Sequence, residues 1–292
     1  MITILDGGMG GELLRREVTP RGELWSAQAL LDAPEKVLEV HRDYIAAGAR
    51  IIITNSYSTI PSYLGKLGLE DRFEELAALA GKLARRAADE SDEQVLVAGS
   101  LPPLDESYRP DLVPADELAG PVYERLARAL EPQVDAFLCE TMSSIRESVN
   151  AARAARSVGG ADKPLYVSWT LAEEAGKGLR SGESIEAAVA AVEGFDIAAY
   201  LFNCTSLQAI TAGLETLKGL TDRPIGAYPN RFNVPDGWTL DNNVQTEYVE
   251  MPVSAFVEQA GRWAEQGVSI IGGCCGIGPD YIEALAGSIA ER

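Results

Sequence analysis

Histidine is nearly absent from this sequence: His41 is the only one in 292 residues. A zinc centre that recruits histidine, or a mechanism built on a histidine general base, would have to use this one residue. His41 lies inside the helical pattern Glu39–Asp43, away from any predicted strand end, so we expect it to have a structural role. The chemistry of the protein must therefore come from other residue types.

Long apolar runs and a basic N-terminal segment are also missing. The chain starts Met1-Ile2-Thr3-Ile4, without the positive charge and extended apolar stretch of a secretory signal, and no run is long enough to cross a membrane. Lys and Arg number 25 against 44 Asp and Glu, which gives a net charge of −19. Such an acidic surface repels nucleic acid and anionic lipid. We expect a cytoplasmic protein with neither as a partner.

Cysteine is scarce, with Cys139, Cys204 and the adjacent pair Cys274-Cys275 as its four copies. No CxxC spacing is present. Together with the missing signal, this favours reduced thiols, and a disulfide between the two neighbours would be strained. Cys139, in the apolar run Ala136–Cys139, is typical of a buried packing residue. The adjacent pair, taken alone, fits metal binding and packing equally well.

Short apolar segments alternate with amphipathic helical patterns along the chain, and a hydrophobic fraction of 46% is ample for a core. The predicted strands are Ile2–Leu5, Ile51–Thr54, Val95–Ala98, Ala136–Cys139, Leu165–Trp169, Ala198–Phe202, Pro224–Ala227 and Val268–Ile271. Helical patterns include Pro34–Ala47, Arg72–Ala88, Glu117–Leu130, Ser144–Ser157, Ser184–Val192, Leu207–Leu217 and Val253–Glu265. Continuous apolar strands indicate a parallel sheet covered by helices. Eight such units without a linker predict an α/β fold, a single (β/α)₈ TIM barrel domain over residues 1–292.

The competing fold is an open doubly wound sheet with a phosphate-binding turn after an early strand. The glycine-rich segment Gly7-Gly8-Met9-Gly10-Gly11 lies at the right place but does not match the GxGxxG spacing. The barrel therefore remains the favoured fold.

Active sites of such barrels form at the carboxyl ends of the strands. Cys204 follows the sixth predicted strand and Cys274-Cys275 follow the eighth, so three sulfurs are expected at one rim. Three thiolates with one position left open are typical of a reactive zinc site. Cys139 ends the fourth strand, but we expect its neighbour Glu140 to turn into the barrel mouth instead. Metal binding by the other three cysteines becomes the favoured interpretation.

Short motifs run nearly from end to end of the chain, most of them at predicted strand ends. They are Leu5-Asp6-Gly7-Gly8, Leu24-Trp25-Ser26, Ile53-Thr54-Asn55-Ser56-Tyr57, Ala98-Gly99-Ser100, Glu140-Thr141, Asn203-Cys204, Tyr228-Pro229-Asn230 and Gly272-Gly273-Cys274-Cys275-Gly276. With these motifs the chain resembles the homocysteine S-methyltransferase family, the zinc-dependent group that includes S-methylmethionine- and betaine-using enzymes. The glycine–cysteine block, joined to the upstream Asn-Cys, is the most specific part of the resemblance.

The resemblance implies a Zn²⁺ ion held by Cys204, Cys274 and Cys275, with the homocysteine sulfur in the fourth position. It also implies that the substrate's amino acid end is held by acidic residues, which correspond here to Asp6 and Glu140. Physical chemistry agrees, because an ammonium group in a barrel mouth needs carboxylates. Asp6 also fits a helix cap, and Glu140 also fits an ion pair at the barrel mouth.

The same resemblance places backbone amides near Gly7 and Gly8 against the substrate carboxylate, and exposed amides of a glycine turn suit such a group. Trp25, in a matching motif, is the aromatic residue most expected to contact substrate. Tyr57, Tyr108, Trp169 and Tyr228 are further aromatic candidates, since quaternary or sulfonium cations bind aromatic faces. The predicted substrate-binding residues are therefore Asp6, Gly7, Gly8, Glu140 and Trp25.

The implied enzyme moves a methyl group from a small cationic donor to the thiolate of homocysteine, giving methionine. The donor would be S-methylmethionine, S-adenosylmethionine or a betaine-like compound. Residues 101–110 and 231–245 depart from the family pattern and leave the choice among these donors open. The substrates are small molecules. Little chain follows the last helical pattern, so we expect the dimerising extensions of the family to be absent and the protein to be a monomer or small homo-oligomer.

Two other functions remain open from sequence. One is a homocysteine-activating module that receives methyl from methyltetrahydrofolate through cobalamin on partner proteins. The other is a non-catalytic zinc–thiolate protein that stores or senses metal or redox state. Acidic residues at the same rim as the thiols favour catalysis over storage, because storage does not require Asp6 and Glu140 there.

Overall fold

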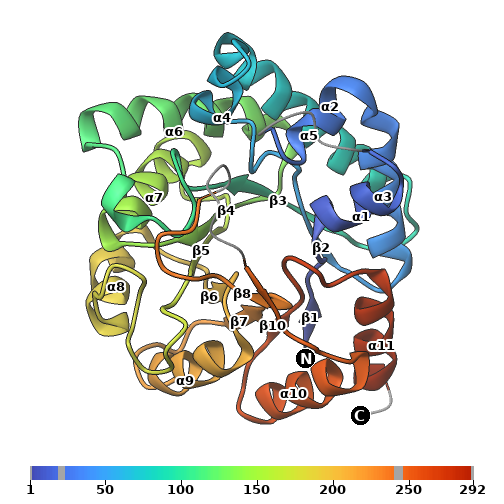
Figure 1. Ribbon diagram of the computed structural model, residues 1–292, viewed down its shortest axis with the longest axis vertical. Helices are drawn as coiled ribbons and strands as arrows, with labels where there is room; N and C mark the ends of the chain where they lie inside the picture. The colour runs from blue at the N-terminus through green and yellow to red at the C-terminus, as the bar shows by residue number, and fades with distance from the viewer. Residues whose placement is uncertain (1, 19–23, 240–245, 291–292) are drawn as a thin grey trace.

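The computed structural model describes residues 2–18, 24–239 and 246–290, and Figure 1 shows strands at the centre with helices around them. Eight strands form one parallel sheet: β1 (Thr3–Ile4), β2 (Ile51–Ile53), β3 (Leu96–Leu101), β4 (Ala136–Met142), β5 (Leu165–Trp169), β6 (Ala199–Asn203), β7 (Ile225–Tyr228) and β10 (Ile270–Ile271). Their order is β1-β10-β7-β6-β5-β4-β3-β2. A parallel bridge between Leu5 and Ile51 joins the two outer strands and closes the barrel. The predicted (β/α)₈ fold is confirmed.

The helices lie on the outside of the barrel, as the chain order requires (Figure 1). They are α1 (Met9–Arg15), α2 (Ala27–Asp32), α3 (Pro34–Ala46), α4 (Pro61–Gly65), α5 (Phe73–Asp89), α6 (Asp116–Leu130), α7 (Ile145–Gly159), α8 (Ile185–Val192), α9 (Leu207–Leu217), α10 (Val253–Glu265) and α11 (Pro279–Ala290). Single 3₁₀ turns cover Glu70–Arg72, Pro110–Leu112, Glu131–Gln133 and Glu193–Phe195. Serine side chains cap α7, α8 and α9 by accepting a backbone N–H of the first turn. In the described residues no helix has the length and apolar content to cross a bilayer.

Alternation along the strands divides the apolar core into two layers. Leu138 and Leu201 belong to the cluster inside the barrel, whereas Phe137 and Phe202 belong to the cluster between strands and helices. Cys139 lies in the outer layer and is fully buried, which confirms its predicted packing role.

His41 is likewise buried, on the inward side of α3. Burial lowers the pKa of this imidazole to about 4, so it is neutral at physiological pH. Neither ring nitrogen has a hydrogen-bond partner among the described residues. The expected structural role fits this placement, since His41 does not line the cavity described below.

Four strands continue further than the apolar pattern predicts: β6 and β7 by one residue, β3 and β4 by three. β3 runs to Leu101 and β4 to Met142, so Ser100 and Glu140 lie within strands rather than after them. Both extensions combine a buried apolar residue, Leu101 or Met142, with backbone N–H groups of Ser100 and Thr141 that donate to side chains at the ends of other strands. The register between β4 and β5 shifts after Cys139, where Thr141 adopts a left-handed φ of 60°.

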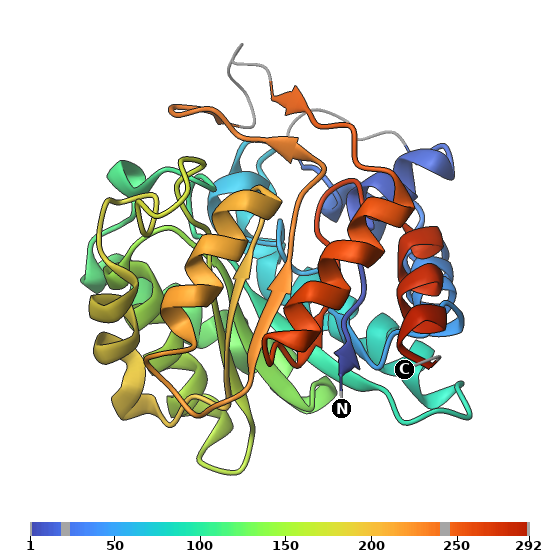
Figure 2. The ribbon, with the colours of Figure 1, turned by 90° about the horizontal axis from the view of Figure 1, so that it is seen from below.

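A short antiparallel pair stands outside the barrel and was not predicted from the sequence. It joins β8 (Phe232–Asn233) to β9 (Glu247–Tyr248). Figure 2 shows these strands over the carboxyl ends of the barrel strands, on the side opposite the marked N-terminus. Two-residue strands carry too little alternation to be recognised in sequence. The pair lies over the rim at which the sequence predicts the site.

Candidate active site

The three predicted ligand sulfurs meet at the carboxyl rim of the barrel. Cys204 follows β6, and Cys274 and Cys275 follow β10. The ligand atoms of all three lie within 4.8 Å of one another. β6 and β10 are separated in the sheet only by β7, which brings both loops to one side of the mouth. The predicted convergence of these sulfurs is confirmed.

The state of the sulfurs differs from the expectation of three reduced thiols. Cys204 and Cys274 form a disulfide with their Cα atoms 5.8 Å apart, and Cys275 is free. Sulfurs gathered closely enough to share an ion are also close enough to bond to one another. The two neighbours are not joined, in agreement with the strain expected for such a bond.

Reduction of this disulfide returns two potential ligands beside Cys275. Burial, followed by the charge of Glu140, raises the pKa of the Cys275 thiol to about 12. At neutral pH this sulfur therefore becomes a thiolate only when a cation lies next to it. Three soft donors in one small volume suit Zn²⁺, so the residues present fit the ion that the sequence implies.

The loops that carry the sulfurs are fixed by nearby side chains. Cys204 has a left-handed φ of 54°, and the hydroxyl of Thr170 donates to its carbonyl at 3.3 Å. The side-chain oxygen of Asn230 accepts the Cys275 N–H at 3.2 Å. A Cβ on Gly273 would overlap the side chain of Ile277, so only glycine fits there.

Asp6 lies where β1 meets the mouth, and its two carboxylate oxygens differ. Oδ2 accepts the Ile53 N–H at 2.8 Å, whereas Oδ1 is buried and has no hydrogen-bond partner among the described residues. Burial is the main reason that the pKa of this carboxyl is well above its usual range, and the charge of Glu140 adds to it. Asp6 is not a helix cap, because α1 begins after Gly8 without a side-chain cap.

Glu140 projects from β4 into the same mouth. The Ser100 hydroxyl donates to its Oε1, and no salt bridge to it is found in the described part of the chain. Burial raises the pKa of Glu140 to about 7 even though this hydrogen bond lowers it. The next residue, Thr141, is held through Asn203, whose Oδ1 accepts the Thr141 N–H at 3.0 Å and whose Nδ2 donates to Oγ1 at 2.8 Å.

The two glycine amides have different roles. The Gly8 N–H donates to the carbonyl of Ile277 at 2.9 Å, so it is not free to bind a substrate. Among the described residues, no acceptor is found for the Gly7 N–H. Of the two amides suggested by the sequence, Gly7 is thus the one that remains available for a carboxylate.

A cavity of about 540 Å³ joins the sulfurs, the two carboxylates and the glycine loop. Its charged lining residues within the described chain are Asp6 and Glu140. Its aromatic lining residues are Trp25, Tyr57, Tyr63, Tyr108, Tyr228, Phe232 and Trp238. Carboxylates and aromatic rings without a lining cation favour positively charged ligands.

The aromatic candidates from the sequence separate into two groups. Trp25 lines the cavity with 38% of its surface exposed, at the edge of the mouth. Trp169 does not line it: the ring is buried in the outer core and stacks on Tyr200 with centroids 5.8 Å apart. Trp169 is therefore a packing residue.

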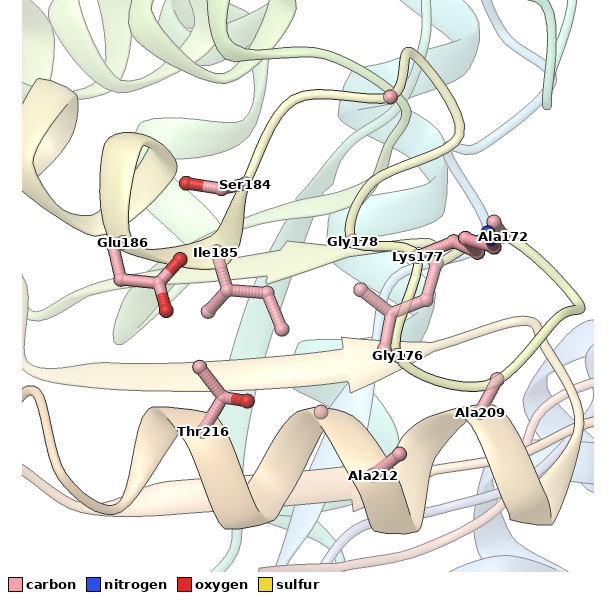
Figure 3. Close-up of a pocket in the computed structure, with 13 residues that line it drawn as sticks. Ala172, Gly176, Lys177, Gly178, Ser184, Ile185, Glu186, Ala209, Ala212 and Thr216 are labelled. Carbon is pink, nitrogen blue, oxygen red and sulfur yellow. The ribbon is translucent and has the colours of Figure 1, made fainter.

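A second cavity, of about 140 Å³, lies between the loop before α8 and helix α9 (Figure 3). The Ser184 hydroxyl beside it caps α8, and Lys177 pairs with Glu174 at 3.4 Å. None of the predicted site residues lines this cavity. The larger cavity is the candidate active site.

Several residues that shape the site received no role from the sequence. Ser100 binds Glu140, Asn203 fixes Thr141, and Asn230 holds Cys275. Ser100 and Asn203 stand in the last two positions of their strands and Asn230 follows β7, and this closeness to the mouth is the signal that could have identified them. Their partners lie between 40 and 62 residues away in sequence, so the pairings themselves could not be read from spacing.

Comparison with known proteins gives a consistent result. Residues 3–289 match the family model for homocysteine S-methyltransferase. The chain is 30% identical to the homocysteine S-methyltransferase YbgG of Bacillus subtilis, covering 98% of this chain and 93% of that protein. It also matches solved structures of the homocysteine methyltransferase MmuM from Escherichia coli. The metallated form is 30% identical with a TM-score of 0.82, covering 98% of this chain and 96% of MmuM. The oxidised form is 29% identical with a TM-score of 0.81, covering 100% and 96%.

Proposed function

The chain belongs to the homocysteine S-methyltransferase family, and on this premise we propose that it uses zinc to transfer a methyl group from a small cationic donor to homocysteine. The observation that carries the proposal is the convergence, in one cavity, of three cysteine sulfurs with two buried carboxylates. Thiolates suit the ion, and the carboxylates suit an amino acid's ammonium group.

Cys204, Cys274 and Cys275 are the proposed ligands, in their reduced state. Zinc held there would keep the homocysteine sulfur as a thiolate at neutral pH, although a free thiol has a pKa near ~8.5. Solved structures of the relative MmuM include a metallated form and an oxidised form. The disulfide form would lack two of the three ligands and would be inactive.

Asp6 and Glu140 would bind the ammonium group of homocysteine. Asp6 Oδ1 is a buried acceptor without a partner in the described residues, and an ammonium N–H would satisfy it. The positive charge would also relieve the repulsion that each carboxylate exerts on the other. The Gly7 amide would donate to the substrate carboxylate, while the Gly8 amide holds the loop.

The methyl donor would occupy the aromatic half of the cavity. Tyr108 and Trp238 meet edge to face there with centroids 5.6 Å apart, and the Arg180 guanidinium lies 4.9 Å from the Tyr108 ring centre. Arg180 also donates to the Val234 carbonyl at 2.9 Å and pairs with Glu173 at 2.9 Å. These contacts join the loops after β3, β5 and β7 into one wall, against which a sulfonium or quaternary ammonium group could lie.

The test is a donor panel with reduced, zinc-loaded protein and homocysteine. S-methylmethionine, S-adenosylmethionine and betaine are each supplied, and methionine is measured. Methionine formation by the purified chain supports the proposal, and replacement of any of the three cysteines by alanine should remove zinc and activity together. Full activity in zinc-free protein would refute it. Zinc binding without turnover on any donor would favour the storage function instead.

A cobalamin-linked module is the less favoured function. The curated homocysteine S-methyltransferase from Bacillus subtilis has 93% of its own length covered by this chain, so a protein of this size carries that name without additional domains. Turnover that requires methyltetrahydrofolate and a cobalamin protein, and no simple donor, would reverse this preference.

A further inference from the structure

One buried tyrosine on α3 touches two loops of the site. The hydroxyl oxygen of Tyr44 lies 3.1 Å from the carbonyl oxygen of Gly8 and 3.0 Å from that of Ile277. Gly8 belongs to the substrate loop, defined here as residues 6–8. Ile277 belongs to the cysteine loop, residues 272–278. The tyrosine side chain is buried and does not line the cavity.

The two loops are in direct contact with each other above this hydroxyl. The Gly8 N–H donates to Ile277 O at 2.9 Å, and the Gly273 N–H donates to Asp6 O at 2.9 Å. A Cβ on Gly8 would lie 2.7 Å from the carbonyl oxygen of Cys274. The place that a side chain at position 8 would take is therefore already filled by the cysteine loop, and only glycine fits there.

The hydroxyl also separates two carbonyl oxygens that point toward the same place. Each carbonyl carries partial negative charge. Ile277 O already accepts the Gly8 N–H, and the Tyr44 hydroxyl supplies a further donor within reach of both oxygens. Burial and the charge of Asp6 raise the pKa of Tyr44 well above its usual range, which keeps the donor proton in place. Tyr44 is thus a neutral donor on α3, and its hydroxyl faces a carbonyl from each of the two loops.

We propose that Tyr44 is a positioning residue that sets the spacing between the cysteine loop and the substrate loop, so that metal affinity and homocysteine affinity both depend on its hydroxyl. The hydroxyl contacts neither the metal ligands' sulfurs nor the cavity, and it acts through Gly8 and Ile277. The homocysteine part of this inference rests on the proposed function. The metal part rests on the sulfur cluster alone.

The experiment compares Tyr44→Phe with Tyr123→Phe in the full chain under reducing conditions. Tyr123 on α6 is a matched control: it is buried, and its hydroxyl donates to a loop carbonyl, Pro102 O, at 2.9 Å. Pro102 and Tyr123 do not line the cavity. Zinc affinity is measured by competition with a chromophoric chelator. Homocysteine Kd is measured by calorimetry at saturating zinc, and thermal unfolding is recorded for both variants.

Tyr44→Phe should weaken zinc and homocysteine binding by about tenfold each, the size expected for one hydrogen bond of about 1.4 kcal/mol. Tyr123→Phe should lower the unfolding temperature comparably and leave both affinities unchanged. The inference is overturned if Tyr44→Phe and Tyr123→Phe bind zinc and homocysteine equally well. It is also overturned if Tyr44→Phe loses affinity for only one of these two ligands. Should Tyr44→Phe fail to fold, para-aminophenylalanine at position 44 retains a donor and should keep wild-type zinc affinity; a tenfold loss there would also overturn it.

The two proposals fail separately. If wild-type protein binds zinc but not homocysteine, the proposed function is wrong, and the chelator competition still decides whether Tyr44 controls the metal loop. If wild-type protein makes methionine and Tyr44→Phe retains both affinities, only the role of Tyr44 is refuted.

Discussion

The pH dependence of homocysteine use should reveal Glu140 as a binding group for the substrate ammonium. Replacement of Glu140 by glutamine keeps the shape of the side chain and its contact with Ser100, but removes the negative charge. The carboxylate binds an ammonium group only when it is ionised. Because burial raises its folded-state pKa to about 7, the ionised fraction is lost as pH falls through 7.

The size of the effect follows from this pKa. A group with a pKa of about 7 is about one-tenth ionised at pH 6 and about nine-tenths ionised at pH 8. The ratio of kcat/KM for homocysteine, wild type over Glu140→Gln, should thus rise about tenfold between these values and then level off. Taking the ratio removes pH effects that both proteins share, including ionisation of the substrate thiol.

Glu147 supplies a matched control for this experiment. It is also buried with a pKa raised to about 7 by burial, but it accepts hydrogen bonds from Ser143 near the start of α7 and does not line the cavity. The ratio of wild type to Glu147→Gln should not change with pH. A flat ratio for Glu140→Gln, or an equal slope for both variants, would refute the assigned role of Glu140.

Three further outcomes are expected. His41→Leu removes two buried nitrogens that have no partner among the described residues. Because the imidazole pKa is lowered from 6.5 to about 4, the unfolding free energy of the variant minus that of wild type should increase by about 3 kcal/mol as pH falls from 7.5 to 4. Urea unfolding at each pH measures this difference, and a difference that stays constant contradicts the prediction. Gly273→Ala should weaken zinc binding at least tenfold, because the added Cβ would overlap the side chain of Ile277. Gly219→Ala, whose added Cβ would have its nearest neighbour 3.6 Å away, should leave zinc affinity unchanged, and chelator competition measures both. Arg180→Lys keeps the charge but loses the planar fork that joins the loops of the proposed donor wall, so the donor KM should rise about tenfold with homocysteine Kd unchanged. A change in homocysteine Kd instead would contradict the assignment of this wall to the donor.

The rhythm of apolar strands was enough to predict the barrel and the rim at which its site lies. Because parallel strands end on the same side, Cys204 and Cys274 could be placed together although 70 residues separate them. The same reasoning placed Asp6 and Glu140 at the mouth. Each of these inferences needs only the position of a residue at the end of its strand.

What sequence could not supply is the contact between particular atoms. Whether two converging sulfurs are bonded depends on redox state as well as position, so the Cys204–Cys274 disulfide was not foreseen. The Gly8 amide is occupied by Ile277, a residue from the other end of the chain. Tyr44 reads as an ordinary apolar-face residue of α3, and only three-dimensional structure shows its hydroxyl between two loops.

The Leu5–Ile51 bridge that closes the barrel lies directly beside Asp6, which lines the candidate site. Next to the bridge from Leu5 to Ile51, the Asp6 N–H donates to Ile51 O at 3.0 Å, and the Asp6 carboxylate accepts the Ile53 N–H at 2.8 Å. A side-chain carboxylate, rather than a main-chain carbonyl, thus accepts a hydrogen bond at the position where the barrel closes. Truncating Asp6 would therefore remove a hydrogen bond between the two closing strands as well as the carboxylate oxygen that is proposed to bind the substrate ammonium.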